Sequence, residues 1–530
     1  MNSSRTSTAS AAAVLDPRRR RVILLASSIA LMAVVASVSG LNVAQPQLAT
    51  TFQVGHGTVL WVINTYTLTL AALLLPLGAL GDRRGRKPVL LAGLALFGVA
   101  NLMAALAPSV EMMIAARLLS GVGAALIMPV TLSVITASFP DGERSKAIGV
   151  WTAVAGGGGI LGMYLSALLV DVATWRWLFA LPVVLTLTAA AVTVRSVPNS
   201  REAVTSRFDL PGAAASVVTV ITLTYALHEA PALGWGHPRM LALLGVAALA
   251  GVTFVLRELR TAAPLLDLRY FRTRGLSSGS TLLLVLFGVQ AGVSLVLYPF
   301  FQVVLGWSGL VSTLALMPLA LLMMVASGLA PRVAARVGAR TAMAAGLVVA
   351  ASGLALMAVV VSADGGYLTV LPGLVALGLG SGLAMTPSTE AITSSLPREQ
   401  QGVASAVNDL TRELGAALGI ALLGGVLTAG YHAAVSGRLA GVPEAVAGPA
   451  RDGIATAAVA AEGAGAHAEQ VLTAAQEAFV AGWQRAMWVG VAALVVVLAL
   501  TVLRGPERRT PGDTAPATSP VEPAAVPPVE

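Results

Sequence analysis

Residues 22–81 contain no Asp, Glu, Lys or Arg. A helix needs about 20 residues to cross the hydrocarbon core of a bilayer, so this stretch is long enough for two spans. Pro46, Gly55 and Gly57 mark a turn between them. Backbone groups in lipid must be hydrogen-bonded within their own segment, so both spans are expected to be helices. The stretch therefore predicts a chain that crosses a membrane more than once.

Charge is scarce throughout the 530 residues: 11% are charged and 56% are hydrophobic. A soluble domain carries roughly 25% charged residues, so this composition cannot cover a water-facing surface. The net charge is +8. The cations flank apolar stretches, which indicates membrane topology and contact with anionic lipid, not binding of nucleic acid. The chain has no cysteine and five scattered histidines, so we expect no thiol chemistry, metal site or cofactor.

Apolar stretches of membrane length recur along the whole chain. They predict an all-α polytopic membrane protein of about fourteen spans. The expected spans are residues 22–44, 58–80, 88–106, 112–136, 146–170, 177–196, 211–229, 238–256, 276–302, 309–331, 341–361, 367–389, 401–427 and 480–503.

Lys and Arg gather in alternate loops, such as 83–87, 144–146, 257–274 and 332–340. The opposite loops carry little beyond Arg176, Arg438 and Arg451. Cytoplasmic loops are the ones enriched in Lys and Arg. An even number of spans then places both termini in the cytoplasm.

The turn at residues 78–88, GALGDRRGRKP, carries the strongest local signal. Its glycines permit a tight turn and close approach, and Pro88 suits the first turn of a helix. Asp82 can accept from a helix N-terminus or pair with a neighbouring Arg. Anchoring at the membrane surface would explain the cations but not Asp82 or the paired glycines.

A later segment repeats part of this turn. Arg336, Gly338 and Arg340 match Arg83, Gly85 and Lys87, while the acidic residue of the first turn becomes Ala335. Internal repeats of this kind are typical of transporter folds, so the echo supports a duplicated architecture.

The turn at 78–88 resembles motif A of the major facilitator superfamily, and residues 116–125 resemble its motif B. Residues 61–75, 175–179, 209–212 and 402–425 are similar to the fourteen-span drug:proton antiporter branch. The resemblance implies a conformational latch between two halves that stabilises one access state. The latch residues would be Gly78, Gly81, Asp82, Arg83, Gly85, Arg86 and Lys87.

The resemblance also implies two six-helix halves with two extra helices between them. We expect cytoplasmic tails at 1–21 and 505–530, the second of them disordered because it is rich in Pro and Ala. The halves would occupy 22–200 and 266–504, with the inserted pair at 201–265. Residues 430–478, rich in Ala and Gly, are expected to form an outer loop with some amphipathic helix.

Several charged residues fall within or near predicted spans. Arg117 lies in the fourth span, where it would either face the bundle with a partner or extend to the outer interface. Asp409, Arg412 and Glu413 share a helix face in the thirteenth span. One carboxylate can pair with Arg412, leaving the other to carry a proton; a static ion-pair network is the alternative. Glu390 is a further candidate for proton coupling.

Two departures from the family pattern bear on coupling. Ser37 stands where the first span of the family has an acidic residue. Met163 stands for the proline of the fifth-span antiporter motif, and Ser166 and Ala167 stand for its glycine pair. Any coupling would therefore depend on the C-terminal half.

These observations predict a secondary transporter and not an enzyme, since no catalytic set or phosphate-binding loop is evident. It would act as a monomer in the plasma membrane and export hydrophobic or amphipathic small molecules by proton antiport. The alternatives are an uncoupled or metabolite-dedicated carrier, or a sensor or scaffold that does not transport. Polar or aromatic groups on apolar helices are the candidate substrate contacts: Asn64, Tyr66, Gln290, Tyr298 and Gln302.

Overall fold

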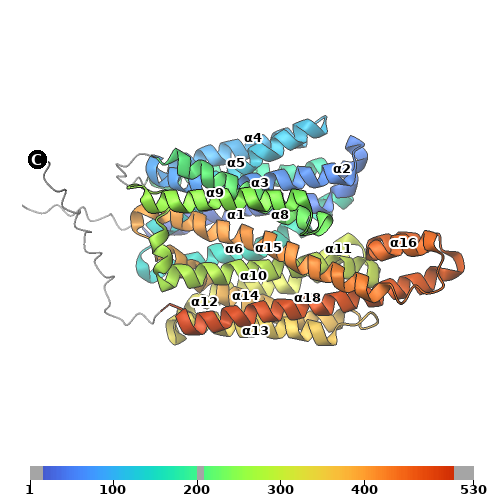
Figure 1. The fold of residues 1–530 in the computed structure, drawn as a ribbon. Helices are drawn as coiled ribbons and strands as arrows, with labels where there is room; N and C mark the ends of the chain where they lie inside the picture. The colour runs from blue at the N-terminus through green and yellow to red at the C-terminus, as the bar shows by residue number, and fades with distance from the viewer. Residues whose placement is uncertain (1–15, 200–207, 507–530) are drawn as a thin grey trace, which may run out of the picture.

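A computed structural model describes residues 16–199 and 208–506. Over these residues the chain forms helices and connecting turns, without a strand. Fourteen of the described helical segments are long and apolar enough to cross a membrane. Figure 1 shows them running side by side in one bundle. The all-α, fourteen-span prediction is therefore confirmed.

The N-terminal half contains six of the spans. Packing of α1 against α6 and α7, and of α5 against α3 and α4, holds them together. Their bounds are α1 Pro17–Val43, α3 His56–Arg84, α4 Arg86–Ala105, α5 Val110–Ser138, α6 Asp141–Val172 and α7 Ala180–Ser196, with the short α2 Gln45–Phe52 between α1 and α3.

The C-terminal half repeats this plan. Its tenth span is broken at Leu316, where the seven-residue α11 ends and α12 begins. The elements are α10 Arg274–Pro299, α11 Gly309–Ala315, α12 Met317–Val337, α13 Ala339–Val360, α14 Tyr367–Thr393, α15 Gln401–Val435 and α18 Ala468–Arg504.

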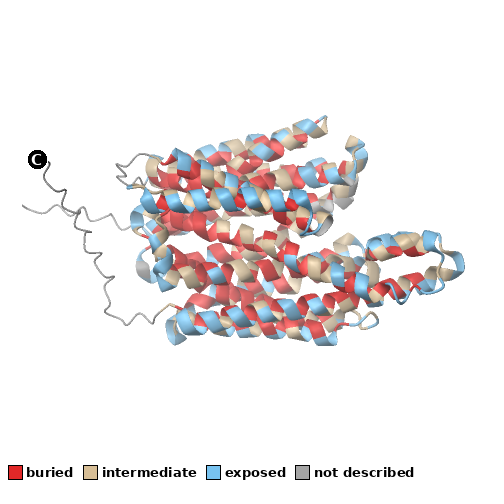
Figure 2. Ribbon diagram, in the orientation of Figure 1, coloured by how far each residue is buried: buried red, intermediate tan, exposed pale blue. Residues whose placement is uncertain are grey.

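The inserted pair, α8 Leu210–Leu233 and α9 Pro238–Arg260, packs through α8 against α3 and α15. Asp209 begins α8 by accepting from the Gly212 N–H at 3.1 Å, and Arg257 donates to the same carboxylate at 2.8 Å. Figure 2 shows little burial along α9, as expected for a helix that faces lipid.

The first residue of α1 and the last residue of α18 lie at the same end of the bundle. We call the end where α1 begins and α18 ends the terminal end, and the opposite end, where α16 projects in Figure 1, the hairpin end. Two turns at the terminal end share a backbone conformation: Gly85, between α3 and α4, has φ +102°, and Gly338, between α12 and α13, has φ +92°. Positive φ at these values requires glycine.

Helices extend beyond several predicted limits. The N-terminal tail was expected to reach residue 21, but α1 begins at Pro17, because Asp16 accepts from the Arg18 N–H and proline suits a first helical turn. The predicted boundary at 200–201 and nearly all of the tail at 505–530 lie outside the described residues.

The expected outer loop at 430–478 is largely helical. Its Ala-rich sequence favours helix, so α15 continues through Val435 and α18 begins at Ala468. Between them lie α16 Glu444–Asp452 and α17 Ile454–Glu462. The Tyr431 hydroxyl donates to the Ala450 carbonyl at 2.6 Å and attaches this hairpin to α15.

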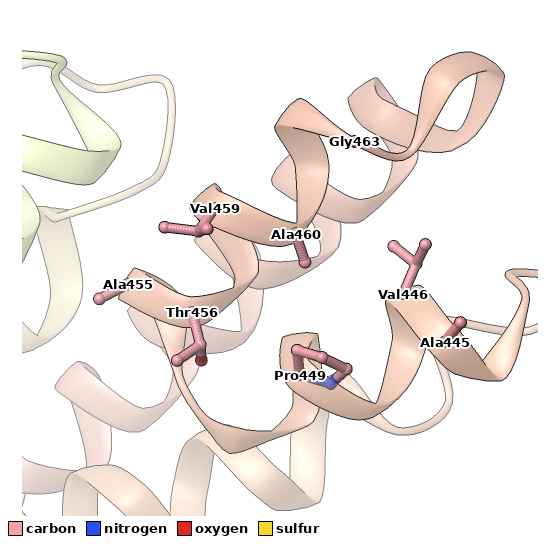
Figure 3. Close-up of a pocket in the computed structure, with 8 residues that line it drawn as sticks. All are labelled: Ala445, Val446, Pro449, Ala455, Thr456, Val459, Ala460 and Gly463. Carbon is pink, nitrogen blue, oxygen red and sulfur yellow. The ribbon is translucent and has the colours of Figure 1, made fainter.

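A groove of about 630 Å³ lies between α16 and α17. Figure 3 shows small apolar side chains around it, including Ala455, Val459 and Ala460, with Thr456 as the one hydroxyl. The residues that line the groove carry no charge. The groove lies on the projecting hairpin, apart from the charged residues of the spans.

Candidate functional site

At the terminal end, Asp82 joins the two halves. Its carboxylate accepts from the backbone N–H of Gly402 at 2.7 and 2.9 Å and from that of Val403 at 3.2 Å. These N–H groups belong to the first turn of α15, which has no partners for them within the helix. The N-terminus of a helix also attracts negative charge, so Asp82 is an electrostatic cap on the opposite half.

Arg86 completes this contact. Its Nη2 donates to the Asp82 carboxylate at 3.2 Å and to the Arg398 carbonyl at 3.1 Å. Asp82 is 3% exposed and Arg86 is 1% exposed. Removing one partner of such a buried pair leaves the other charge uncompensated, at a cost of about 3–5 kcal/mol.

Glycines allow α3 and α15 to approach closely enough for this cap. A Cβ added at Gly78 would lie 2.7 Å from the Gly402 carbonyl oxygen and 2.7 Å from the Ala406 Cβ. A Cβ added at Gly402 would lie 2.8 Å from the Asp82 carboxylate. Larger residues at either position would push the helices apart.

The other predicted latch residues lie around this contact but serve the N-terminal half and the inserted pair. Gly81 packs against Val130 of α5, and Lys87 donates to the Val194 carbonyl at 2.8 Å. The Arg83 guanidinium lies 5.2 Å from the ring centroid of Phe208, next to the start of α8.

A second polar contact between the halves lies nearby. The Glu390 carboxylate, on α14, accepts from the Ser145 hydroxyl of α6. On α6 itself, Glu143 pairs with Arg20 of α1 at 3.1 Å. In this structure Glu390 therefore joins α14 to α6.

Asp409, Arg412 and Glu413 share one face of α15, as predicted. Arg412 Nη1 is 3.7 Å from Asp409 Oδ1, and Asn408 donates to the same oxygen at 3.0 Å. The guanidinium lies 4.4 Å from the ring centroid of Phe287 and 5.5 Å from that of Trp151, which belongs to α6. Arg412 thus contacts both halves.

This group lies deeper in the bundle than the Asp82 contact. At 1.5 Å per residue, Asp409 lies about 12 Å and Glu413 about 18 Å beyond the start of α15. Asp409 is fully buried, whereas Glu413 is half-buried. The two carboxylates are therefore well inside the bundle and in different surroundings.

Arg117 faces the interior of the N-terminal half. It is fully buried; its guanidinium lies 4.3 Å from the ring centroid of Tyr66, and its Nη1 donates to the Ser37 hydroxyl at 3.1 Å. The alternative, extension to the outer interface, does not occur in this structure. Sequence reasoning anticipated a buried partner but did not identify Tyr66 or Ser37 as that partner.

The five candidate substrate contacts do not form one group. Tyr66 belongs to the core around Arg117, half-buried Asn64 lies on the same helix, and Gln302 is exposed near the hairpin end. Gln290 donates to the Met323 sulfur at 3.4 Å, and the Tyr298 hydroxyl contacts the Met163 sulfur and Thr313. Of the five, Gln290 and Tyr298 contact thioethers.

Methionines line the contact between α6 and the C-terminal half, a feature that sequence reasoning missed. A Cβ added at Gly156 would lie 3.0 Å from Met323 and 3.3 Å from Met385, and Gly157 packs against Met324. The glycine run 156–159 was the available signal, because glycines on a span let large flexible side chains approach. Thioethers adapt to varied apolar shapes.

Among the described residues, no group of three or more His, Asp or Glu side chains could hold a metal ion. The arrangement consists of contacts between two helical halves and a few buried charges.

Comparison with known proteins identifies a family for the chain. The family model described as Major Facilitator Superfamily matches residues 27–420. The chain is 34% identical over 469 residues to the multidrug efflux pump LfrA of Mycolicibacterium smegmatis, covering 87% of this chain and 90% of LfrA. It is 35% identical over 409 residues to the puromycin resistance protein pur8 of Streptomyces alboniger, covering 75% and 80% respectively.

A solved structure shows the same fold. The crystal structure of the human organic anion transporter MFSD10 superposes with a TM-score of 0.59 at 15% identity, covering 91% of this chain and 99% of that one. The family match and the efflux and resistance relatives define a membrane transporter, not an enzyme. The chain belongs to the Major Facilitator Superfamily, and its spans and relatives fit the fourteen-span drug:proton antiporter branch.

Proposed function

We propose that this transporter exports hydrophobic or amphipathic small molecules across the plasma membrane by alternating access. The observation that carries the proposal is the Asp82 cap on α15, because it closes the terminal end with a contact that must break if that end is to open. Several relatives are named for multidrug efflux or antibiotic resistance, which supports this substrate class.

The terminal end is proposed to face the cytoplasm. The turns there carry Arg83, Arg84, Arg86 and Lys87 in the N-terminal half, and Arg336 and Arg340 in the C-terminal half. This enrichment is what the positive-inside rule requires of cytoplasmic loops. The structure would then be closed to the cytoplasm, with both termini on that side.

Proton antiport is proposed to depend on Asp409 and Glu413. Asp409 lies 3.7 Å from Arg412, and Glu413 follows Arg412 on α15; the Arg412 guanidinium also contacts Trp151 of the other half. A proton gained or lost here changes the charge balance at the contact between the halves. Each charge that crosses the membrane contributes about 2.3 kcal/mol per 100 mV.

The test is efflux of a fluorescent lipophilic cation from proteoliposomes with an imposed pH gradient. Asp409→Asn and Glu413→Gln should each abolish acceleration by the gradient while substrate exchange continues. Glu477→Gln is the matched control, because Glu477 is a half-exposed carboxylate paired with Arg438 on the hairpin side. If both test variants respond fully to the gradient, the coupling assignment is wrong.

An uncoupled carrier is the second candidate, favoured by Ser37, which leaves the N-terminal half without the first-span acid, and by Met163. It predicts exchange at the wild-type rate with no response to the gradient in any variant.

We propose that the monomer is the working unit; a monomeric mass in nanodiscs that retain substrate binding is the expected result.

A further inference from the structure

Arg117 is a buried cation without a carboxylate. The other deeply buried arginines in the described chain have one: Arg86 lies 3.2 Å from Asp82, Arg412 lies 3.7 Å from Asp409, and Arg20 lies 3.1 Å from Glu143. No described carboxylate lies within ion-pair distance of Arg117, although it is 0% exposed. A guanidinium stays protonated in proteins, so it cannot avoid this cost by losing its proton.

The neutral partners of Arg117 satisfy only part of the guanidinium. Nη1 donates to Ser37, whose hydroxyl donates to Asn101 Oδ1 at 3.2 Å, and Asn101 donates to the Phe97 carbonyl at 2.8 Å. In this series of hydrogen bonds, Ser37 and Asn101 each donate away from Arg117. Tyr66 contacts the guanidinium with its aromatic ring and supplies no hydrogen-bond acceptor to the edge of the guanidinium.

Two nitrogens of Arg117, Nε and Nη2, are buried and find no acceptor among the described residues. Their N–H groups point along the same edge of the guanidinium, which is the fork that binds a carboxylate through two parallel hydrogen bonds. The unsatisfied edge is therefore shaped for an anion.

The site lies near the hairpin end of the bundle. Arg117 lies seven residues from the start of α5 at the hairpin end, about 10 Å at 1.5 Å per residue. Ser37 occupies the position on α1 that faces the guanidinium, so a neutral hydroxyl stands where a fixed counter-charge would fit.

We propose that Arg117 is an anion-binding site, in which Nε and Nη2 hold a small inorganic anion such as chloride or the carboxylate of a transported molecule. The second form rests on the export function proposed above and makes acidic amphipathic molecules a substrate class. Binding itself does not depend on export.

The test measures binding through stability, because a ligand that binds the folded state raises the unfolding temperature. Full-length protein in nanodiscs is heated while tryptophan fluorescence is recorded. Sodium isethionate is exchanged for sodium chloride or sodium benzoate at constant ionic strength. A saturable rise in unfolding temperature with at least one of these anions is expected.

Two variants test whether this rise in unfolding temperature depends on Arg117. Arg117→Gln should lose it. Ser37→Asp supplies an internal carboxylate, so it should also lose the rise while unfolding in isethionate at or above the wild-type temperature. Arg438→Gln, an exposed arginine of the hairpin, is the matched control and should keep the wild-type response.

The outcomes separate the two sources. Saturation by chloride with no further effect of benzoate supports an inorganic anion, and saturation by benzoate alone supports a substrate carboxylate. The proposal is overturned if neither anion raises the wild-type unfolding temperature, or if Ser37→Asp responds as the wild type does. Because no transport is measured, failure of the export proposal would leave this result unchanged.

Discussion

The turn around Gly85 and the turn around Gly338 have the same backbone but different contacts. In each, the glycine N–H donates to the carbonyl four residues earlier, at 3.1 Å from Gly81 and at 2.8 Å from Ala334. The first turn follows Asp82, which caps α15 of the opposite half. The second follows Ala335, which is exposed.

The helices that precede these turns also meet the opposite half differently. Four residues before Asp82, Gly78 brings the backbone of α3 against α15. Four residues before Ala335, Pro331 packs against Gly149 of α6, where a Cβ would lie 3.1 Å from the proline ring. The glycine turn is thus shared by both halves, whereas the carboxylate that contacts the opposite half belongs to the first turn.

The largest effect should come from Asp82→Ala. The change leaves Arg86 buried without its carboxylate and leaves two α15 N–H groups uncapped, so the closed terminal end should lose stability relative to the open state. The chain has no cysteine, so a single Ala79→Cys reports opening without background. Ala79 lies on α3, is 4% exposed and packs in the core of the C-terminal half. Its labelling by maleimide should be at least tenfold faster.

Asp209→Asn is the control for this variant. Asp209 is also a buried carboxylate that caps a helix and pairs with an arginine, but it caps the inserted pair. It should lower the unfolding temperature with little change in Ala79→Cys labelling. Equal acceleration by both variants would mean that general destabilisation, not the loss of the cap, exposes Ala79.

Gly402→Ala should be next in size. It keeps every charge of the first turn but places a methyl group against the Gly78 carbonyl and the Asp82 carboxylate, so α3 and α15 must separate. Labelling at Ala79→Cys should rise severalfold. Gly425→Ala, on the same helix with no heavy atom within 4 Å, should behave as the wild type. Unchanged labelling in Gly402→Ala would show that the close approach is dispensable.

Gly85→Ala and Gly338→Ala test what the two turns share. Each forces a side chain into positive φ, at a cost of about 1–3 kcal/mol, so both variants should unfold at lower temperature. Gly85→Ala should have the larger effect, because its Cβ would also lie 2.9 Å from Asn199 Oδ1. Only Gly85→Ala should accelerate Ala79→Cys labelling; acceleration by Gly338→Ala would give the second turn a role in closure.

Ala335→Asp should have the smallest effect. It restores the acidic residue to the second turn, but position 335 is exposed and Pro331 occupies the contact with α6. Surface changes of this kind usually alter stability by no more than about 0.5 kcal/mol. Labelling and unfolding temperature should match the wild type, and slower labelling would reveal a second lock.

The spans and the turn at residues 78–88 could be predicted from the sequence because their signals are local. Each predicted span overlaps one of the fourteen helical segments, although the tenth is broken at Leu316, since stretches with few charges have few alternatives in lipid. The repeated glycine likewise indicated a real conformational requirement, because Gly85 and Gly338 both have positive φ. Asp82 was expected to meet a helix N-terminus or an arginine, and it meets both.

Contacts between distant helices were not accessible in the same way. Nothing in the sequence around Arg117 specifies that Ser37 and Tyr66 surround it, because those residues lie on other spans. The methionine contacts of Gly156 depend on how α6 docks against α12 and α14. The extension of α15 and α18 past the bilayer depends on the hairpin that attaches to them, through bonds such as that of Tyr431.

That extension has a mechanical consequence. With 35 and 37 residues, α15 and α18 are about 53 and 56 Å long, against a hydrocarbon core of about 30 Å. They therefore project together from the C-terminal half, and the Arg438 and Glu477 side chains meet between them at 3.0 Å. Any rocking of that half is magnified at the tip, where a spectroscopic label would report the smallest rotations of the transport cycle.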